Sequence, residues 1–299
     1  MTQFSEYLSD EVVEDSSDGI IGRREALRRL GLLGIGVALA VPILAACDAA
    51  APTGTSPAPA SPAAATPAGP APLSTEAITF PGPDGRQVQG AWAVADSPKG
   101  AVLVVHENRG LTDHIRSVAG RLAASGYSAL AVDLLSEEGG TASFPGEAEV
   151  SAALNTIPDT RFVADMKAAV DELSRRTPDA AIGAVGFCFG GGMVWTLLDA
   201  GEPRLAAAAP FYGPLPEGAD FAGSPNAAVL GMYGEQDERV NTTRDAATAA
   251  LEKAGLTHEV MTYPGAGHAF FNDTGERYDP TVAASAYDEL MGWFGEHLG

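Results

Sequence analysis

Apolar and polar positions follow two alternating periods from residue 75 to the C-terminus. Short apolar runs of strand length occur at 88–94, 101–105, 128–132, 181–185, 206–212, 228–233 and 259–263. Segments with helical spacing lie among them, at 115–125, 161–173, 191–198, 245–254 and 282–297. Nearly continuous apolar strands are typical of a parallel sheet that is covered on both faces. The pattern predicts one α/β domain over residues 75–299, with a mostly parallel central sheet and helices on both faces.

The N-terminal region has a different pattern. Residues 1–22 are polar and acidic without apolar periodicity, so no packed element is expected there. The paired Arg23 and Arg24 precede an apolar run at 30–46 that is interrupted by glycines and Pro42. A basic stretch before a moderately apolar segment is typical of an export signal, and the paired arginines indicate the twin-arginine type. Residues 1–46 are therefore predicted to be an export signal, with the Tat and Sec routes both open.

The signal ends in Leu44-Ala45-Ala46-Cys47, which resembles the lipobox of bacterial lipoproteins. The resemblance implies that Cys47 is acylated, becomes the new N-terminus and anchors the chain to the outer face of the cell membrane. An uncleaved transmembrane anchor is the alternative, although the apolar run is short for a span. Residues 47–74 are almost entirely Ala, Pro, Ser, Thr and Gly, with Leu73 the single large apolar side chain, and they read as a tether.

Charge and cysteine content narrow the possible partners. A formal net charge of -21 argues against nucleic-acid binding, which requires clustered Lys and Arg. Cys47 and Cys188 are the two cysteines, and no disulfide is expected if the first is acylated. A monomer is expected. Its expected partners are the membrane, through the lipid anchor, and a small-molecule substrate.

The stretch Gly186-Phe187-Cys188-Phe189-Gly190 is the clearest chemical signal. It joins a buried strand to a helix, and it is the G-x-S-x-G nucleophile elbow with cysteine in place of serine. A helix N-terminus favours negative charge on sulfur. A small buried cysteine in a glycine-rich turn would be the alternative, but the strand–turn–helix context favours a nucleophile at Cys188.

Two further residues follow in the order that a catalytic triad of this type requires. Asp237 comes directly after the predicted strand 228–233, and His268 lies on a loop after the strand 259–263. α/β-Hydrolases run nucleophile, acid, histidine along the chain. His268 would accept the thiol proton, and Asp237 would hold the imidazole tautomer. The five histidines have no metal-ligand spacing, so neither a metal nor another cofactor is expected.

These motifs resemble the dienelactone hydrolase family, and the resemblance extends from about residue 76 to the C-terminus. The matching pieces are residues 106–110, 186–191, 234–237 and 267–270. The family implies an α/β-hydrolase fold, a Cys-His-Asp triad and hydrolysis of an ester or lactone. It also implies that Glu107 contacts the resting thiol and that the backbone N–H groups of Asn108 and Phe189 form the oxyanion hole. A surface acid paired with Arg109 is the alternative for Glu107.

One departure from the family concerns the substrate. Dienelactone hydrolases hold a substrate carboxylate with arginines, one of them soon after the catalytic histidine, whereas here the chain has no arginine between His268 and Arg277. Arg161 does not match a family position either. The candidate substrate contacts are Arg109, Tyr212 and Phe270. Two other functions stay open: an esterase or thioesterase on another substrate outside the cytoplasm, and a catalytically silent lipoprotein that binds a ligand in the pocket.

Overall fold

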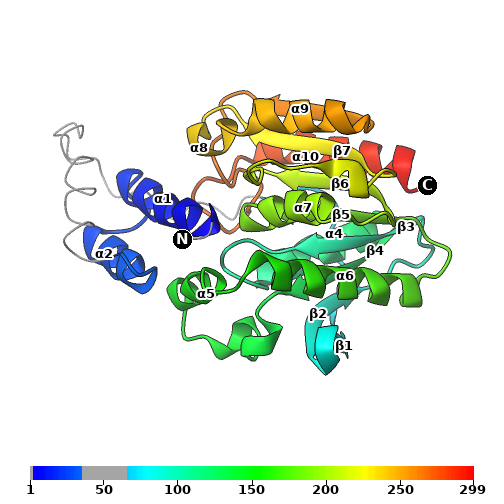
Figure 1. Ribbon diagram of the computed structural model, residues 1–299, viewed down its shortest axis with the longest axis horizontal. Helices are drawn as coiled ribbons and strands as arrows, with labels where there is room; N and C mark the ends of the chain where they lie inside the picture. Colours follow the sequence, from blue (N-terminus) through cyan, green and yellow to red (C-terminus); the bar gives the residue numbers. More distant parts are fainter. Residues whose placement is uncertain (1–2, 36–65) are drawn as a thin grey trace.

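The computed structural model describes residues 3–35 and 66–299, in which one sheet has helices on both faces (Figure 1). The strand order is β1-β2-β4-β3-β5-β6-β7-β8. β2 pairs antiparallel with both β1 and β4, and the pairs from β4 through β3 to β8 are parallel. The strands are β1 (Glu76–Pro81), β2 (Gln87–Ala93), β3 (Gly100–Val105), β4 (Tyr127–Asp133), β5 (Ile182–Phe187), β6 (Leu205–Phe211), β7 (Ala228–Gly234) and β8 (His258–Tyr263). The mostly parallel sheet predicted from the apolar runs is confirmed.

Helices cover the sheet from both sides. α4 and α10 pack on one face, and α6 and α7 pack on the other. The helices of the domain are α4 (Asp113–Ala124), α5 (Glu147–Leu154), α6 (Asp159–Arg176), α7 (Phe189–Asp199), α8 (Glu238–Asn241), α9 (Arg244–Ala254) and α10 (Pro280–His297). The sequence pattern predicts neither β1 nor the short helices α5 and α8. β1 is an exposed edge strand with only Phe80 buried, and so it has little apolar signal.

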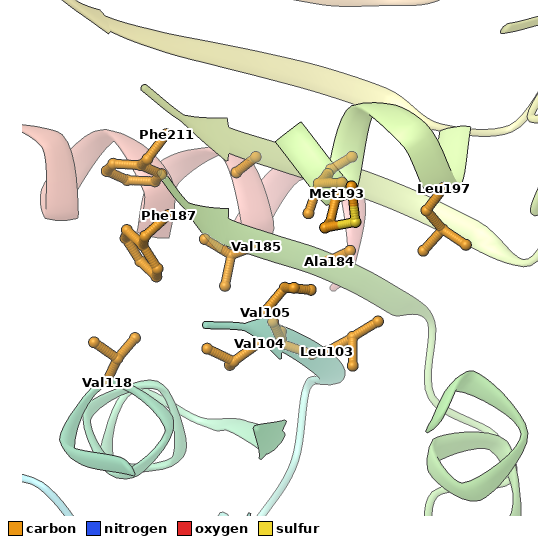
Figure 2. Packing of buried hydrophobic residues seen from close by; sticks show 14 of the residues in the cluster. Leu103, Val104, Val105, Val118, Ala184, Val185, Phe187, Met193, Leu197 and Phe211 are labelled. Atoms are coloured by element: carbon orange, nitrogen blue, oxygen red, sulfur yellow. The ribbon is translucent and has the colours of Figure 1, made fainter. Parts of the chain in front are cut away.

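The core is the layer between the central strands and their covering helices. Leu103, Val104 and Val105 of β3 are fully buried, and their side chains leave the strand on alternate faces. Val118 of α4 closes one side of this layer, and Met193 and Leu197 of α7 lie on the other (Figure 2). Each such side chain contributes about 1.5–3 kcal/mol on burial. This core fixes β3 and β5, whose carboxyl ends lead into the predicted catalytic residues.

Within residues 3–35 two helices precede the domain, which corrects the expectation for residues 1–22. α1 (Gln3–Ser17) and α2 (Arg23–Leu32) pack on each other, and α2 also contacts α5. In Figure 1 the blue α1 lies beside the domain near the start of α7. Tyr7, Leu8 and Val12 are buried on one side of α1. Hydropathy alone does not reveal this helix, because acidic side chains share its inward face.

The chain also contacts the domain before residue 75. The Tyr278 hydroxyl donates to the Thr66 carbonyl at 2.8 Å, and Arg121 Nη1 donates to the Ala68 carbonyl at 2.8 Å. Ala68 is buried. Thr66 and Ala68, which lie within the predicted tether, therefore contact the domain. Cys47 and most of the 30–46 run lie outside the described residues, and no helix within 3–35 or 66–299 is long and apolar enough to cross a membrane.

Candidate active site

Cys188 lies in a strained turn between β5 and α7. Its φ of 56° is in the left-handed region, which residues other than glycine rarely adopt. A Cβ at Gly186 would lie 2.1 Å from the Gly190 carbonyl oxygen, and one at Gly190 would lie 2.3 Å from the Val105 carbonyl oxygen. Only glycine fits at these two positions. The turn therefore places the thiol at the N-terminus of α7, as the elbow motif predicts.

His268 and Asp237 form a buried pair beside this thiol. His268 Nδ1 donates to Asp237 Oδ2 at 2.6 Å, and both side chains are 1% exposed. The other oxygen of Asp237 accepts from the backbone N–H of Val240 at 3.2 Å and so caps α8. Asp237 therefore caps α8 with one carboxylate oxygen and holds His268 with the other.

The pKa values within this pair move apart. Burial alone would raise the pKa of Asp237, but the charge and hydrogen bond of His268, together with Arg239, lower it below its usual value. Burial alone would lower the pKa of His268, but the carboxylate of Asp237 and the neighbouring Cys188 raise it well above its usual value. An ionised carboxylate thus stabilises a positively charged imidazole, which is the state that forms when a histidine accepts a proton.

The thiol faces two side chains from α1. The Tyr7 hydroxyl lies 3.2 Å from Cys188 Sγ and 3.3 Å from His268 Nε2. The thiol also points to Glu11, whose carboxylate oxygens lie 3.7 and 3.9 Å from Sγ. Burial, and then the negative charge of Glu11, raise the pKa of the thiol, while His268 lowers it. Cys188 is therefore held as a neutral thiol while α1 is in place.

Glu107 lies next to the site, after β3. It is only 4% exposed, which argues against a surface acid, and Arg109 pairs with Glu147 at 3.5 Å. Asn272 Nδ2 donates to Glu107 Oε2 at 2.5 Å. Burial and the nearby Glu11 raise the pKa of Glu107. The structure thus puts Asn272 against Glu107, and Glu11 takes the thiol contact that the family resemblance implies for Glu107.

A small cavity connects the thiol to the residues expected around it. Its volume is about 40 Å³, and Glu107, Asn108, Arg109 and Cys188 line it together with Arg277. Asn108 and Phe189 follow β3 and β5 at the same edge of the sheet, where the oxyanion hole is expected. Because parallel strands end at one edge, segments far apart in the sequence meet here.

The other substrate candidates lie deeper or farther away. The Tyr212 ring packs edge-on against His268 at 5.2 Å between ring centroids, and Phe270 packs on Tyr212 at the same spacing. Both are fully buried, and neither lines the cavity beside Cys188. Arg161 pairs with Glu138 at 2.6 Å, away from the site.

Among the described residues, one group could hold a metal ion. The ligand atoms of Glu11, Cys188 and His268 all lie within 4.8 Å of one another. Carboxylate, thiolate and imidazole are ligands that suit zinc. Two of the three are also the expected nucleophile and base, and the third comes from α1. The absence of a metal stays a prediction.

Comparison with known proteins identifies a family for this fold. Residues 88–298 match the Dienelactone hydrolase family. The chain belongs to this family. An Escherichia coli (strain K12) protein provisionally named a carboxymethylenebutenolidase is 35% identical over 221 residues, which cover 69% of this chain and 80% of that protein. The resemblance inferred from the motifs is confirmed, and the α/β-hydrolase fold with it.

Solved structures of the family superpose on most of the chain. A Klebsiella pneumoniae protein provisionally described as a dienelactone hydrolase is 30% identical, with a TM-score of 0.65 over 75% of this chain and all of that chain. A dienelactone hydrolase-like promiscuous phosphotriesterase from metagenomic libraries is 26% identical, with a TM-score of 0.62 over 76% of this chain and all of its own. Family membership makes this dienelactone hydrolase homologue a hydrolase.

Four residues at the site are not predicted by the sequence pattern. Tyr7 and Glu11 belong to the segment in which hydropathy predicts no packed element. Arg239 and Arg277 lie outside the family positions for arginine. Glu14 pairs with Arg239 at 3.3 Å. Arg239 lies in the first turn of α8, two residues after its cap Asp237, and this closeness in the sequence is a signal that could have placed it near the site.

Proposed function

We propose that this dienelactone hydrolase homologue cleaves a small ester or lactone with Cys188 as nucleophile, His268 as general base and Asp237 as the residue that orients the imidazole. The observation that carries the proposal is the left-handed turn at Cys188 beside the buried His268–Asp237 pair. A structural cysteine does not need backbone strain of this kind, which costs about 1–3 kcal/mol.

The reaction follows from these positions. His268 takes the proton from the thiol, and Cys188 Sγ forms a bond to the substrate carbonyl carbon. The negative oxygen of the tetrahedral intermediate accepts hydrogen bonds from the backbone N–H groups of Phe189 and Asn108. The carbon–oxygen bond of the ester then breaks, and the leaving alkoxide takes the proton from His268. His268 next activates a water that cleaves the thioester, releasing the acid and restoring the thiol.

The rim of the site favours a substrate with a carboxylate. Arg109 and Arg277 both line the cavity at Cys188, in a chain whose net charge is strongly negative. Guanidinium groups bind carboxylates through paired hydrogen bonds. Esters that carry a carboxylate are therefore expected to have a lower KM than matched neutral esters, and Arg277→Ala is expected to remove that difference.

The test of the activity is turnover of p-nitrophenyl acetate by the full chain and by a Tyr7→Ala variant, each with and without Cys188→Ala. Turnover by the Tyr7→Ala protein that disappears when Cys188→Ala is added supports the proposal, whether or not the full chain itself shows turnover. If turnover is unchanged, or is absent from all four proteins, the chain is a ligand-binding lipoprotein or acts on another class of substrate, such as thioesters.

The proposed location is the outer face of the cell membrane, through a lipid on Cys47. The order of paired arginines, apolar run and Leu-Ala-Ala-Cys supports it. The intact mass of protein extracted from membranes should show the loss of residues 1–46 and the gain of lipid. Soluble, full-length, unmodified protein from an exporting cell would contradict this.

A further inference from the structure

Tyr7 occupies the place where a substrate must react. Its hydroxyl lies within hydrogen-bonding distance of both Cys188 Sγ and His268 Nε2, the two atoms between which a proton and an acyl group would pass. Its side chain is buried, which raises the pKa of the phenol well above its usual value, so the group is neutral. No ester carbonyl can approach Sγ while this hydroxyl stays there.

Arginines of the domain hold α1 in this position. The Arg239 guanidinium lies over the Tyr7 ring, 4.1 Å from its centroid, and Nη1 donates to the Tyr7 carbonyl at 3.1 Å. Arg277 pairs with Asp15 at 2.8 Å and with Asp18 at 2.7 Å. Cation–π contacts and ion pairs are stronger when they are shielded from solvent, and Arg239, Arg277 and Asp15 are all less than a fifth exposed.

The space that remains beside the thiol is too small for a substrate. The cavity that reaches Cys188 has a volume of about 40 Å³. Small-molecule sites are typically about 300–1,000 Å³. This void has room for a few waters at most, so catalysis requires that α1 move.

We propose that α1 is an intramolecular inhibitor that occupies the active site as a substrate mimic, and that the enzyme becomes active only when α1 leaves. The inhibitor places a phenol at the reacting atoms and the carboxylate of Glu11 beside the thiol, where a substrate carboxylate would lie close to Arg109. The inference rests on the proposed function of Cys188, which supplies the activity that α1 would block.

The inhibitor and the export signal share one segment. Arg23 and Arg24 lie exposed at the start of α2, which packs on α1. α1 therefore covers the catalytic site while the paired arginines remain on the surface. Cleavage after Ala46, as the sequence predicts, would remove both helices together. The chain would be inactive before export and active after processing.

The experiment compares the full chain with a Tyr7→Ala, Glu11→Ala variant. Iodoacetamide labelling of Cys188 is followed by peptide mass spectrometry, which separates it from Cys47, and ester turnover is measured alongside. The labelling rate scales with the fraction of open molecules, so we expect it to rise roughly tenfold or more in the variant, with turnover rising in parallel. Ser17→Ala, an exposed change on α1 whose hydroxyl bonds only within the helix, is the matched control and is expected to change neither.

A second variant leaves Tyr7 and Glu11, the two α1 side chains that face the thiol, unchanged. Asp15→Asn with Asp18→Asn removes the ion pairs to Arg277 and is expected to speed labelling as well. Raising NaCl from about 0.05 to 1 M should do the same in the unmodified chain, because salt screens such pairs. Thermal unfolding of each protein distinguishes release of α1 from loss of the fold.

Three results decide the question. Equal labelling of the full chain and both variants would overturn the inference. Faster labelling in both variants without ester turnover would support the inhibitor and reject the proposed function instead. EDTA is expected to have no effect, and labelling that EDTA alone restored would show that a metal bridge, rather than α1, keeps the thiol covered.

Discussion

The α/β domain and the N-terminal helices are held together by different forces. In the domain, β3 and β5 are buried along their whole length, between neighbouring strands and covering helices. Among the side chains of α1 that the structure describes, Tyr7, Leu8 and Val12 are the buried apolar ones. Acids of α1 pair with Arg239 and Arg277 of the domain. Apolar burial gives the domain stability that does not depend on salt, whereas the charged contacts of α1 weaken as salt rises. The comparison implies that α1 can leave while the domain stays folded.

His268→Ala removes a proposed catalytic residue of the α/β domain and should have the largest effect on activity. Measured with Tyr7→Ala already present, kcat/KM for an ester is expected to fall about a hundred- to ten-thousand-fold, because the general base is lost. The substitution also leaves Asp237 buried without its partner, so the melting temperature is expected to fall.

The matched variant for this prediction is His268→Gln, whose amide can still donate to Asp237. It should lose as much activity as His268→Ala but keep more of the stability. Near-normal turnover in either variant would show that a group other than His268 acts as the base. The site in the domain would then not work as proposed.

Leu197→Ala and Leu30→Ala compare the two regions directly. Both leucines are fully buried, the first in the core of the domain and the second between α2 and its neighbours. Leu197→Ala is expected to cost about 2–5 kcal/mol in the free energy of unfolding of the domain, measured with urea. Leu30→Ala is expected to leave that transition unchanged and to speed labelling of Cys188 instead. If it lowered domain stability equally, the helices and the domain would form one cooperative unit.

Glu11→Gln should have the smallest effect, and the group that it tests is the thiol of Cys188. Burial and Glu11 both raise the pKa of Cys188, so removing the charge of Glu11 lowers that pKa and leaves more thiolate at a given neutral pH. The midpoint of the labelling-versus-pH curve should move to lower pH, and the rate at pH 7 should rise several-fold. A midpoint that stays in place would mean that Glu11 does not face the thiol in solution.

The same contrast explains what could be predicted from the sequence. The strands of the domain are predicted because continuous apolar runs report burial on both faces. Cys188, Asp237 and His268 could be placed by their order and by the strand before each. β1 was missed because one buried Phe80 gives no pattern.

The N-terminal helix was missed for a different physical reason. Hydropathy predicts a buried face only where that face is apolar, and the inward face of α1 carries Glu11, Glu14 and Asp15. Glu14 pairs with Arg239 and Asp15 pairs with Arg277, and each of these arginines lies more than two hundred residues later in the chain. A pairing of that kind is set by the folded geometry and leaves no local periodicity. The same holds for the contact of Asn272 with Glu107.

Covalent linkage changes how strongly a weak ligand can act. Because Tyr7 and Cys188 belong to one chain, the helix meets its site at an effective concentration that for short flexible connections is of the order of millimolar. A freed peptide would instead be diluted into the surrounding volume, where contacts of modest affinity no longer fill the site. A single peptide-bond cleavage could therefore end the inhibition without any change in the affinity of Tyr7 for the site.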